Sequence, residues 1–160
     1  MPQTIPPAPG ENNGNQTFLI NARWLLTMND DNDVHLEHSL IVEGGRIVGI
    51  LPWKEATEAY PQLPVIDRRE SILMPGLINA HTHLAMNLLK GFADDLPLQT
   101  WLENHIWPAE AAHLSPEFVR DGTELALAES ILAGVTMVND MYFFADTTAK
   151  VCEIAGVKAT

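Results

Sequence analysis

Two histidines, His81 and His83, are the residues of this sequence whose type and spacing most directly suggest chemistry. Side chains at positions i and i+2 of a β-strand point to the same face, so both imidazoles could approach one ion while Thr82 points away. On a helix the same spacing would separate them by about 200°. Histidine is a common zinc ligand, and a catalytic zinc takes about three protein ligands and a water. The pair therefore predicts part of a metal site; the alternative is that both rings only bond to neighbouring backbone.

The pair lies where an apolar strand, expected over residues 73–83, reaches its carboxyl end. The expected helices span residues 100–106, 116–133 and 146–155, and further strands span residues 135–140 and begin again at 157. Strands that alternate with helices predict parallel βαβ units, in a doubly wound sheet or a barrel. In α/β barrels the active site lies at the carboxyl ends of the strands, where His81, His83 and Asp140 all fall.

The second of these helices has clear boundary signals. Ser115 is placed to cap its amino end, Pro116 suits its first position, and Gly134 follows its last residue. Within it, Leu125, Ala128 and Leu132 recur at i, i+3 and i+7. This spacing gives the expected helix one apolar stripe.

The residues before this βα region are typical of a small β-domain. Apolar runs in residues 17–51 predict strands, and two of them flank Gly44-Gly45, which is the signature of a tight hairpin. A short helix is expected over residues 54–60 and an extended segment over 65–68. Residues 1–16 are rich in proline, glycine and polar side chains and are expected to be a disordered tail.

Composition excludes several classes of protein. The 160 residues carry a net charge of −12, which argues against a nucleic-acid partner because such proteins need a basic surface. A single cysteine, Cys152, excludes an internal disulfide and a cysteine-rich zinc module. No apolar run approaches about 18 residues, and no signal peptide is visible, so no membrane partner is expected. These features predict a cytoplasmic globular protein.

A longer stretch around the histidines resembles a known family. The segments that carry the resemblance are LMPGLINAHTHLAMNLLKGFADDLPLQTWLENHIWPAE and, later, GVTMVNDMYF. They are similar to the amidohydrolase superfamily and, more narrowly, to the 5′-methylthioadenosine/S-adenosylhomocysteine deaminases and the related triazine hydrolases. The resemblance covers about residues 17–160.

The resemblance implies a fold and a division into domains. It implies the first strands and helices of a TIM (β/α)8 metal-dependent hydrolase barrel, preceded by part of a small β-sandwich domain. The expected divisions are a tail over residues 1–16, the β-sandwich part over 17–72, and two to three βα units over 73–160.

It also implies roles for particular residues. His81 and His83 match the two metal-binding histidines of the first barrel strand. Glu110 matches the glutamate that binds the ribose hydroxyls, and a carboxylate is well suited to accept hydrogen bonds from a vicinal diol. Trp101 is expected to bind substrate as a wall of the same pocket, with Trp107 beside it. Core packing of the two tryptophans is the alternative.

The chemistry implied is hydrolytic deamination. A divalent metal, with zinc expected and iron, nickel or manganese equally suited to two histidines, would make hydroxide available to add to C6 of an adenine ring, and ammonia would leave. The partners are a small nucleoside substrate (5′-methylthioadenosine, S-adenosylhomocysteine or adenosine) and water. A homo-oligomer is common in the family, but nothing in the sequence fixes the assembly. The single cysteine excludes the cytidine-deaminase class, which needs P-C-x-x-C.

The chain is short for this fold, because the barrel alone needs roughly 200–250 residues. Family members take a third histidine, an aspartate and a glutamate acid/base from later strands, so no catalytic acid/base is expected within this chain. We therefore expect an N-terminal portion of a deaminase. The alternatives are a triazine chloro- or aminohydrolase or a guanine-type deaminase on the same scaffold, and a truncated chain without catalytic activity.

Overall fold

The structure is a computed structural model that describes residues 16–160, in two compact units. The first unit ends at Pro75 and the second is Gly76–Thr160. The predicted tail lies outside the described residues, except for Gln16, which is in no helix or strand. The sequence places the domain boundary after residue 72, and the two units divide three residues later. Each unit is described by itself below.

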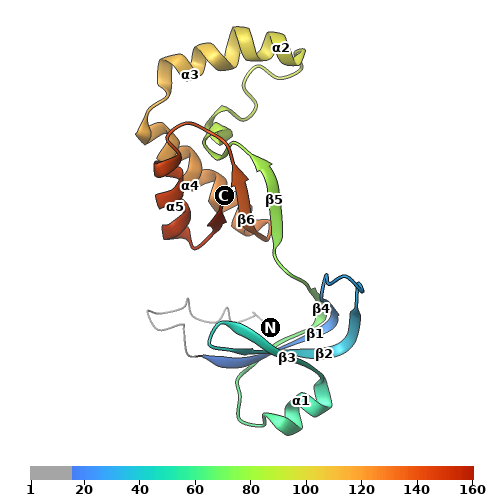
Figure 1. The fold of residues 1–160 in the computed structure, drawn as a ribbon. Coiled ribbons are helices and arrows are strands. Elements are labelled where there is room, and N and C mark those ends of the chain that lie inside the picture. The colour runs from blue at the N-terminus through green and yellow to red at the C-terminus, as the bar shows by residue number, and fades with distance from the viewer. Residues whose placement is uncertain (1–15) are drawn as a thin grey trace, which may run out of the picture. The chain divides into compact units, whose positions relative to one another are not determined.

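The first unit is a four-stranded sheet with one short helix (Figure 1). The strands lie in the order β3-β2-β1-β4, with β1–β2 and β2–β3 antiparallel and β4 parallel to β1. The elements are β1 (Thr17–Leu26), β2 (Val34–Glu43), β3 (Arg46–Pro52), α1 (Trp53–Ala59) and β4 (Val65–Leu73). The structure thus has a single sheet in this part of the described chain, and the β-sandwich stays a prediction.

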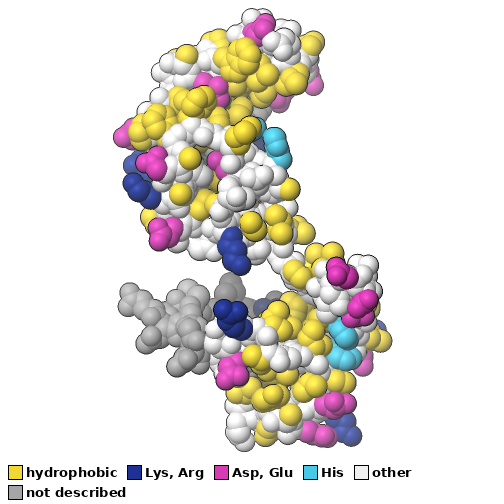
Figure 2. All heavy atoms as spheres, in the orientation of Figure 1, with side chains coloured by type: hydrophobic (Ala, Val, Ile, Leu, Met, Phe, Trp, Pro, Cys, Tyr) yellow, Lys and Arg dark blue, Asp and Glu magenta, His cyan; other side chains and the backbone are white. Residues whose placement is uncertain are grey.

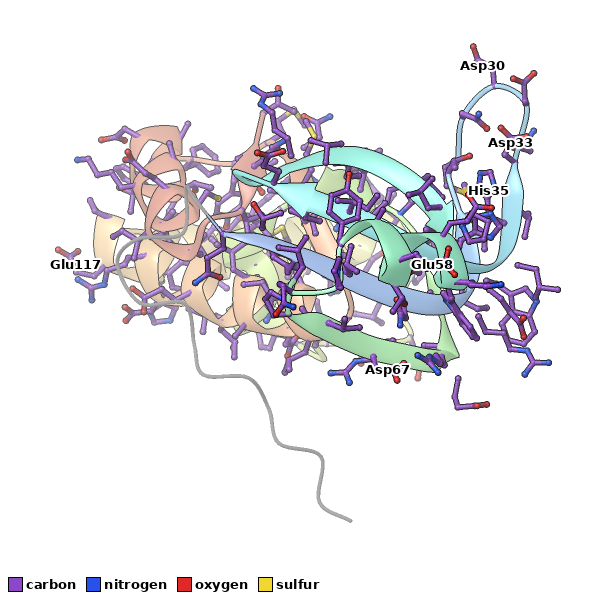
Figure 3. The ribbon with its side chains drawn as sticks, turned by 90° about the horizontal axis from the view of Figure 1, so that it is seen from below. Asp30, Asp33, His35, Glu58, Asp67 and Glu117 are labelled. Carbon is purple, nitrogen blue, oxygen red and sulfur yellow. The ribbon has the colours of Figure 1, made fainter. Side chains whose placement is uncertain are left out.

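The two turns of the β1–β2–β3 meander are built differently. Gly44 and Gly45 have φ of +57° and +75°, so the β2–β3 hairpin predicted at this pair is confirmed. A hairpin of this kind needs positive φ at both central residues, which glycine adopts without strain. The longer β1–β2 connection carries Asp30 and Asp33 (Figure 3). It is closed by side-chain hydrogen bonds, among them Asn29 Nδ2 to Asp33 Oδ2 at 2.9 Å.

The core of the first unit lies between the sheet and helix α1. Leu19 of β1, Ile41 of β2 and Ala56 of α1 are fully buried there. Beside them, Ser39 donates a hydrogen bond of 2.6 Å to the buried Asn21 side chain. The helix predicted over residues 54–60 is confirmed and begins one residue earlier.

The second unit is a parallel sheet with helices, as the alternation of elements predicts (Figure 1). Its strands lie in the order β5-β6-β7, and both pairings are parallel. The strands are β5 (Leu77–Thr82), β6 (Val135–Asp140) and β7 (Lys158–Ala159). The helical segments are η2 (Leu84–Leu89, a 3-10 helix), α2 (Leu98–Trp101), η3 (Leu102–Ile106, a π-helical segment), α3 (Trp107–His113), α4 (Pro116–Leu132) and α5 (Ala145–Ala155). Among residues 16–160, no helix is both long enough and apolar enough to cross a membrane.

Strand β5 begins at Leu77, four residues later than the sequence predicts. The preceding apolar residues belong to the other sheet, where Leu73 pairs with Leu25. Pro75 lies between the two strands, and proline has no N–H to donate to a ladder. Pairing in the second unit therefore starts only where the Leu77 N–H reaches the Gly134 carbonyl, at 2.9 Å.

Helix α4 has the predicted ends but a different buried face. Ser115 caps it by accepting a hydrogen bond from the Phe118 N–H at 3.1 Å, as predicted. The apolar stripe noted in the sequence is not the buried face in this structure, because Leu125 and Leu132 are exposed, Leu132 by 89%. Many other hydrophobic side chains are also visible on the surface, where they are coloured yellow (Figure 2). The residues that are buried instead are Val119, Gly122, Thr123, Ala126 and Leu127.

Small side chains explain why this face is the buried one. A Cβ added at Gly122 would lie 2.4 Å from the carbonyl oxygen of Ala85, so helix α4 approaches η2 backbone to backbone. Ala126 and Leu127 then continue the contact into a core formed with Val138 of β6 and Cys152 of α5. Burial also raises the pKa of the Cys152 thiol, which fits the predicted role of this residue as a small apolar core group.

We expect Gly122→Ala to destabilise the protein by about 2 kcal/mol, because the added methyl group overpacks a rigid backbone contact. Helix propensity alone predicts the opposite sign, a gain of about 1 kcal/mol. Chemical denaturation of the purified protein measures the difference. Leu125→Ala, at an exposed position of the same helix, is the control and should change the free energy of unfolding little. A Gly122→Ala variant that is as stable as the parent would contradict the close approach.

Candidate functional site

The two histidines lie side by side at the carboxyl end of β5. Their ring centroids are 5.0 Å apart and their planes are nearly perpendicular, at 81°. His81 is exposed and His83, the residue just after the strand, is partly buried. The structure thus brings together the pair that the sequence singles out, on the same side of the chain, as the i, i+2 spacing predicts.

His83 is held in one orientation by the residues that follow β6. Its Nδ1 lies 2.5 Å from the carbonyl oxygen of Met141. A carbonyl can only accept, so Nδ1 is the donor of this bond, and in the neutral ring the lone pair is then on Nε2. An outer hydrogen bond of this kind is the usual way in which a metal-binding histidine is fixed in tautomer and direction.

The donor set fits part of a metal site. One imidazole has a free Nε2 and a fixed ring, and the other is exposed beside it. Within residues 16–160, however, no group of three or more His, Cys, Asp or Glu side chains could hold an ion. A catalytic zinc takes about three protein ligands, so these two histidines would be a pair within a larger set.

Asp140, the last residue of β6, supports the turn that follows His83. Its Oδ1 accepts a hydrogen bond of 2.7 Å from the Leu84 N–H. Burial raises the pKa of this carboxyl, and the bond from Leu84 opposes that shift. Asp140 therefore lies at the predicted edge of the sheet and ties the end of β6 to the start of η2.

A cavity of about 430 Å³ opens beside His83. Most of its wall is apolar, and the polar side chains among the lining residues are one imidazole, one carboxylate, one phenol and one indole. The lining residues are His83, Met86, Leu102, Ile106, Trp107, Glu110, Met141, Tyr142 and Phe143.

Glu110 reaches this cavity from a continuous helical run formed by α2, η3 and α3. Residues Leu102, Ile106 and Glu110, spaced by four, all face the cavity. In an α-helix a four-residue step overshoots a full turn by about 40°. A π-helical segment turns less per residue, so the step from Leu102 to Ile106 offsets the step from Ile106 to Glu110.

The sequence predicts a helix that ends near residue 106, and this prediction is wrong. The run continues through Trp107 and Pro108 to His113. Proline cannot donate a backbone hydrogen bond, and its ring crowds the carbonyl four residues earlier. A widened turn just before Pro108 relieves this conflict without ending the helix, so Glu110 lies inside a helical run.

Tyr142 is a site residue that sequence reasoning missed. Its hydroxyl donates a hydrogen bond of 2.6 Å to Oε1 of Glu110. Burial, and then the bond to the Glu110 carboxylate, raise the pKa of the Tyr142 phenol above its usual value, so the phenol keeps its proton. Its place two residues after Asp140, at the carboxyl end of a parallel strand, was the available signal.

Trp101 does not line the cavity that contains Glu110. Its indole N–H donates a hydrogen bond of 2.9 Å to the Phe92 carbonyl and so holds the loop before α2. Trp107 is the tryptophan on the cavity wall. A role for Trp101 in substrate binding stays a prediction.

Known proteins that are similar to this chain match most of its length, in sequence and in structure. The chain is 49% identical over 146 residues to a 5-methylthioadenosine/S-adenosylhomocysteine deaminase of Thermodesulfovibrio yellowstonii, a match that covers 90% of this chain and 33% of the relative. A zinc-bound crystal structure of an adenosine deaminase from Xanthomonas campestris superposes with a TM-score of 0.83 at 44% identity, covering 92% of this chain and 34% of that one. A zinc complex of atrazine chlorohydrolase from Arthrobacter aurescens shares the fold, with a TM-score of 0.77 at 23% identity and coverage of 89% and 34%. The chain thus spans about a third of the length of the curated relatives it matches.

The family assignment rests on the region that holds the site. The Amidohydrolase family profile matches residues 72–159, which include both histidines, Glu110, Asp140 and Tyr142. This match covers more than half of the sequence and coincides with the βα unit of the structure. The chain therefore belongs to the amidohydrolase family.

Proposed function

We propose that this chain supplies part of the active site of a metal-dependent hydrolytic deaminase of adenine nucleosides. The reaction would convert 5′-methylthioadenosine, S-adenosylhomocysteine or adenosine, with one water, into the inosine analogue and ammonia. One observation carries the proposal. The carboxylate of Glu110 and the imidazole of His83 line a single cavity, so a sugar anchor and a metal ligand face the same bound molecule.

His81 and His83 are the proposed metal ligands. When bound, a divalent metal supplies a water acidic enough to act as a nucleophile near neutral pH. The bond from His83 Nδ1 to the Met141 carbonyl fixes the direction of the ring and, in the neutral imidazole, leaves Nε2 as the nitrogen available to a metal. Zinc is the expected ion, in line with the zinc-bound adenosine deaminase of Xanthomonas campestris, and the further ligands would come from residues other than 16–160.

Glu110 is the proposed anchor for the sugar. An ionised carboxylate offers about four acceptor sites on two oxygens, and the Tyr142 hydroxyl occupies one of them. The remaining sites can accept hydrogen bonds from the 2′- and 3′-hydroxyls of a ribose. The apolar walls, with Met86, Met141 and Phe143, suit an adenine ring and the thioether part of a 5′ substituent.

The cavity also indicates what the substrate would not be. No lysine or arginine is among the residues that line it. A phosphorylated nucleotide would face Glu110 without a cationic partner, and an unpaired charge is costly to bury. A nucleoside without a phosphate group fits the described wall better.

The direct test is release of ammonia by the full-length protein supplied with zinc. We expect release from 5′-methylthioadenosine, S-adenosylhomocysteine or adenosine, with conversion of the adenine ring to hypoxanthine seen by ultraviolet absorption. Atrazine and guanine serve as comparison substrates for the two related chemistries. Turnover of only a triazine or only guanine would replace the proposal with that activity, and no turnover of any of them would favour a non-catalytic chain.

A further inference from the structure

We propose that Tyr142 is a positioning residue that fixes the Glu110 carboxylate for a substrate diol and sets the distance between the sugar anchor and the histidine pair. This inference rests on the proposed function. It extends that function to Tyr142, which binds Glu110 and is not itself proposed to bind the sugar. It depends on three features of the described structure, taken in turn below.

The first feature is the geometry of the bond itself. Tyr142 and Glu110 lie 32 residues apart in sequence, and their side chains meet at 2.6 Å on the wall of one cavity. A hydrogen bond to an ionised acceptor is shorter and stronger than one between neutral groups. Because the hydroxyl binds Oε1, rotation of the carboxylate is restricted and Oε2 is left for another donor.

The second feature is how firmly Tyr142 is tied to the strand that carries the histidines. The residue before it, Met141, donates from its N–H to the Thr82 carbonyl at 3.1 Å and accepts from His83 Nδ1 at 2.5 Å. The Tyr142 ring lies with its centroid 6.4 Å from that of His83 and 5.3 Å from that of Phe143. Tyr142 is therefore placed by the same contacts that orient His83.

The third feature is how few hydrogen bonds attach the helical run with Glu110, apart from its apolar packing through Ile106. Figure 1 shows α2 and α3 extending away from the layer formed by α4, α5 and the sheet. Within residues 16–160, the bond between Tyr142 and Glu110 is the hydrogen bond that joins residues 98–113 to the sheet or to the segment after β6. The phenol thus links the anchor on this helical run to the end of the sheet where the histidines lie.

Loss of this link should weaken recognition of the diol more than the chemical step. Without the hydroxyl, the Glu110 carboxylate can rotate and the helical run can shift, so ground-state binding of the ribose suffers. We expect Tyr142→Phe to raise the KM for adenosine about tenfold, with kcat changed by less than about threefold; one hydrogen bond to a charged group is worth about this much. Loss of a residue with only a packing role would not raise KM selectively while leaving kcat nearly unchanged.

The experiment uses the full-length zinc protein in four forms, the parent, Tyr142→Phe, Glu110→Ala and the double variant. Adenosine is the substrate, and 2′,3′-dideoxyadenosine, which lacks the diol, is measured as a competitive inhibitor. We expect the inhibition constant of the dideoxy compound to be unchanged in Tyr142→Phe. We also expect the second substitution to add nothing to kcat/KM once Glu110 is alanine, because the two residues act as one unit.

Tyr60→Phe is the matched control, because Tyr60 is the other tyrosine of the chain and lies in the first unit. It should leave KM and kcat unchanged. Zinc content and the thermal midpoint of Tyr142→Phe are measured alongside, so that a folding defect is seen directly; a variant that has lost zinc or its fold would contradict a role confined to positioning.

The outcomes separate the two proposals. An active parent with an unchanged KM in Tyr142→Phe, or with additive effects in the double variant, overturns this inference and leaves the proposed function standing. A parent protein that releases no ammonia from any adenine nucleoside contradicts the proposed function and this inference together.

Discussion

Replacing His81 and His83 with alanine should leave the full-length protein without a bound metal and without measurable deamination. The two rings lie 5.0 Å apart at the end of β5, and His83 is oriented through its bond to the Met141 carbonyl. Removing both takes away the paired imidazoles of the site, and a third ligand alone would not hold an ion. A loss of at least about a thousandfold in kcat/KM corresponds to about 4 kcal/mol of transition-state stabilisation, which is within what a catalytic metal supplies.

The measurement is the metal content of the purified protein by mass spectrometry, read together with ammonia release. His113→Ala is the matched control, since His113 is an exposed histidine at the end of α3 and is not on the cavity wall. It should retain both metal and activity. Unchanged metal content in the double alanine variant would refute the assignment of the two ligands.

Replacing Glu110 with alanine should reduce kcat/KM for adenosine by at least about a hundredfold, because two hydroxyl groups of the sugar lose a charged acceptor and each such bond is worth about 1.5–3 kcal/mol. The effect should fall on nucleosides, since a triazine has no diol to anchor. It should leave metal content unchanged, because Glu110 lies on the helical run and takes part in no cluster of metal-binding side chains within the described residues.

Glu117→Ala provides the comparison for this second prediction. Glu117 is an exposed carboxylate in the first turn of α4, so its loss tests the effect of one fewer negative charge in the same unit. We expect its kcat/KM to match that of the parent. A Glu110→Ala variant that weakens inhibition by 2′,3′-dideoxyadenosine as much as it raises the KM for adenosine would contradict a role in binding the diol.

Local signals in the sequence were enough to predict most elements of the second unit. Ser115, Pro116 and Gly134 set the ends of α4, because capping and a positive φ of +81° at Gly134 depend on these residue types alone. The i, i+2 rule placed His81 and His83 on one face, because the period of a strand does not depend on its partners. The parallel pairing followed from the alternation of strands and helices.

Contacts that depend on close approach could not be predicted in the same way. The buried face of α4 includes Gly122 and Ala126 beside Val119 and Leu127, whereas Leu125 and Leu132 are exposed. Counting apolar residues favours the larger side chains, whereas packing against Ala85 selects the face on which two backbones can meet. Only the tertiary arrangement carries that information.

In the candidate site, too, some residues could be predicted from the sequence and others depend on tertiary contacts. The histidines and Glu110 were identified from motifs, but the role of Tyr142 depends on a contact across 32 residues. The π-helical segment Leu102–Ile106, which brings Glu110 to the cavity, depends on how the helix accommodates Pro108. Neither feature has a periodic signature, so residue spacing alone could not show that Glu110 and Tyr142 meet.

The central claim, that the histidine pair serves a metal-dependent deaminase, is tested most directly by ammonia release from 5′-methylthioadenosine before and after removal of the metal. The full-length protein is assayed as purified, after dialysis against a chelator, and after zinc is added back. The account predicts ammonia in the first and third assays and none in the second, with no recovery in the His81→Ala, His83→Ala variant. Ammonia release that continues undiminished after the metal has been removed would contradict it.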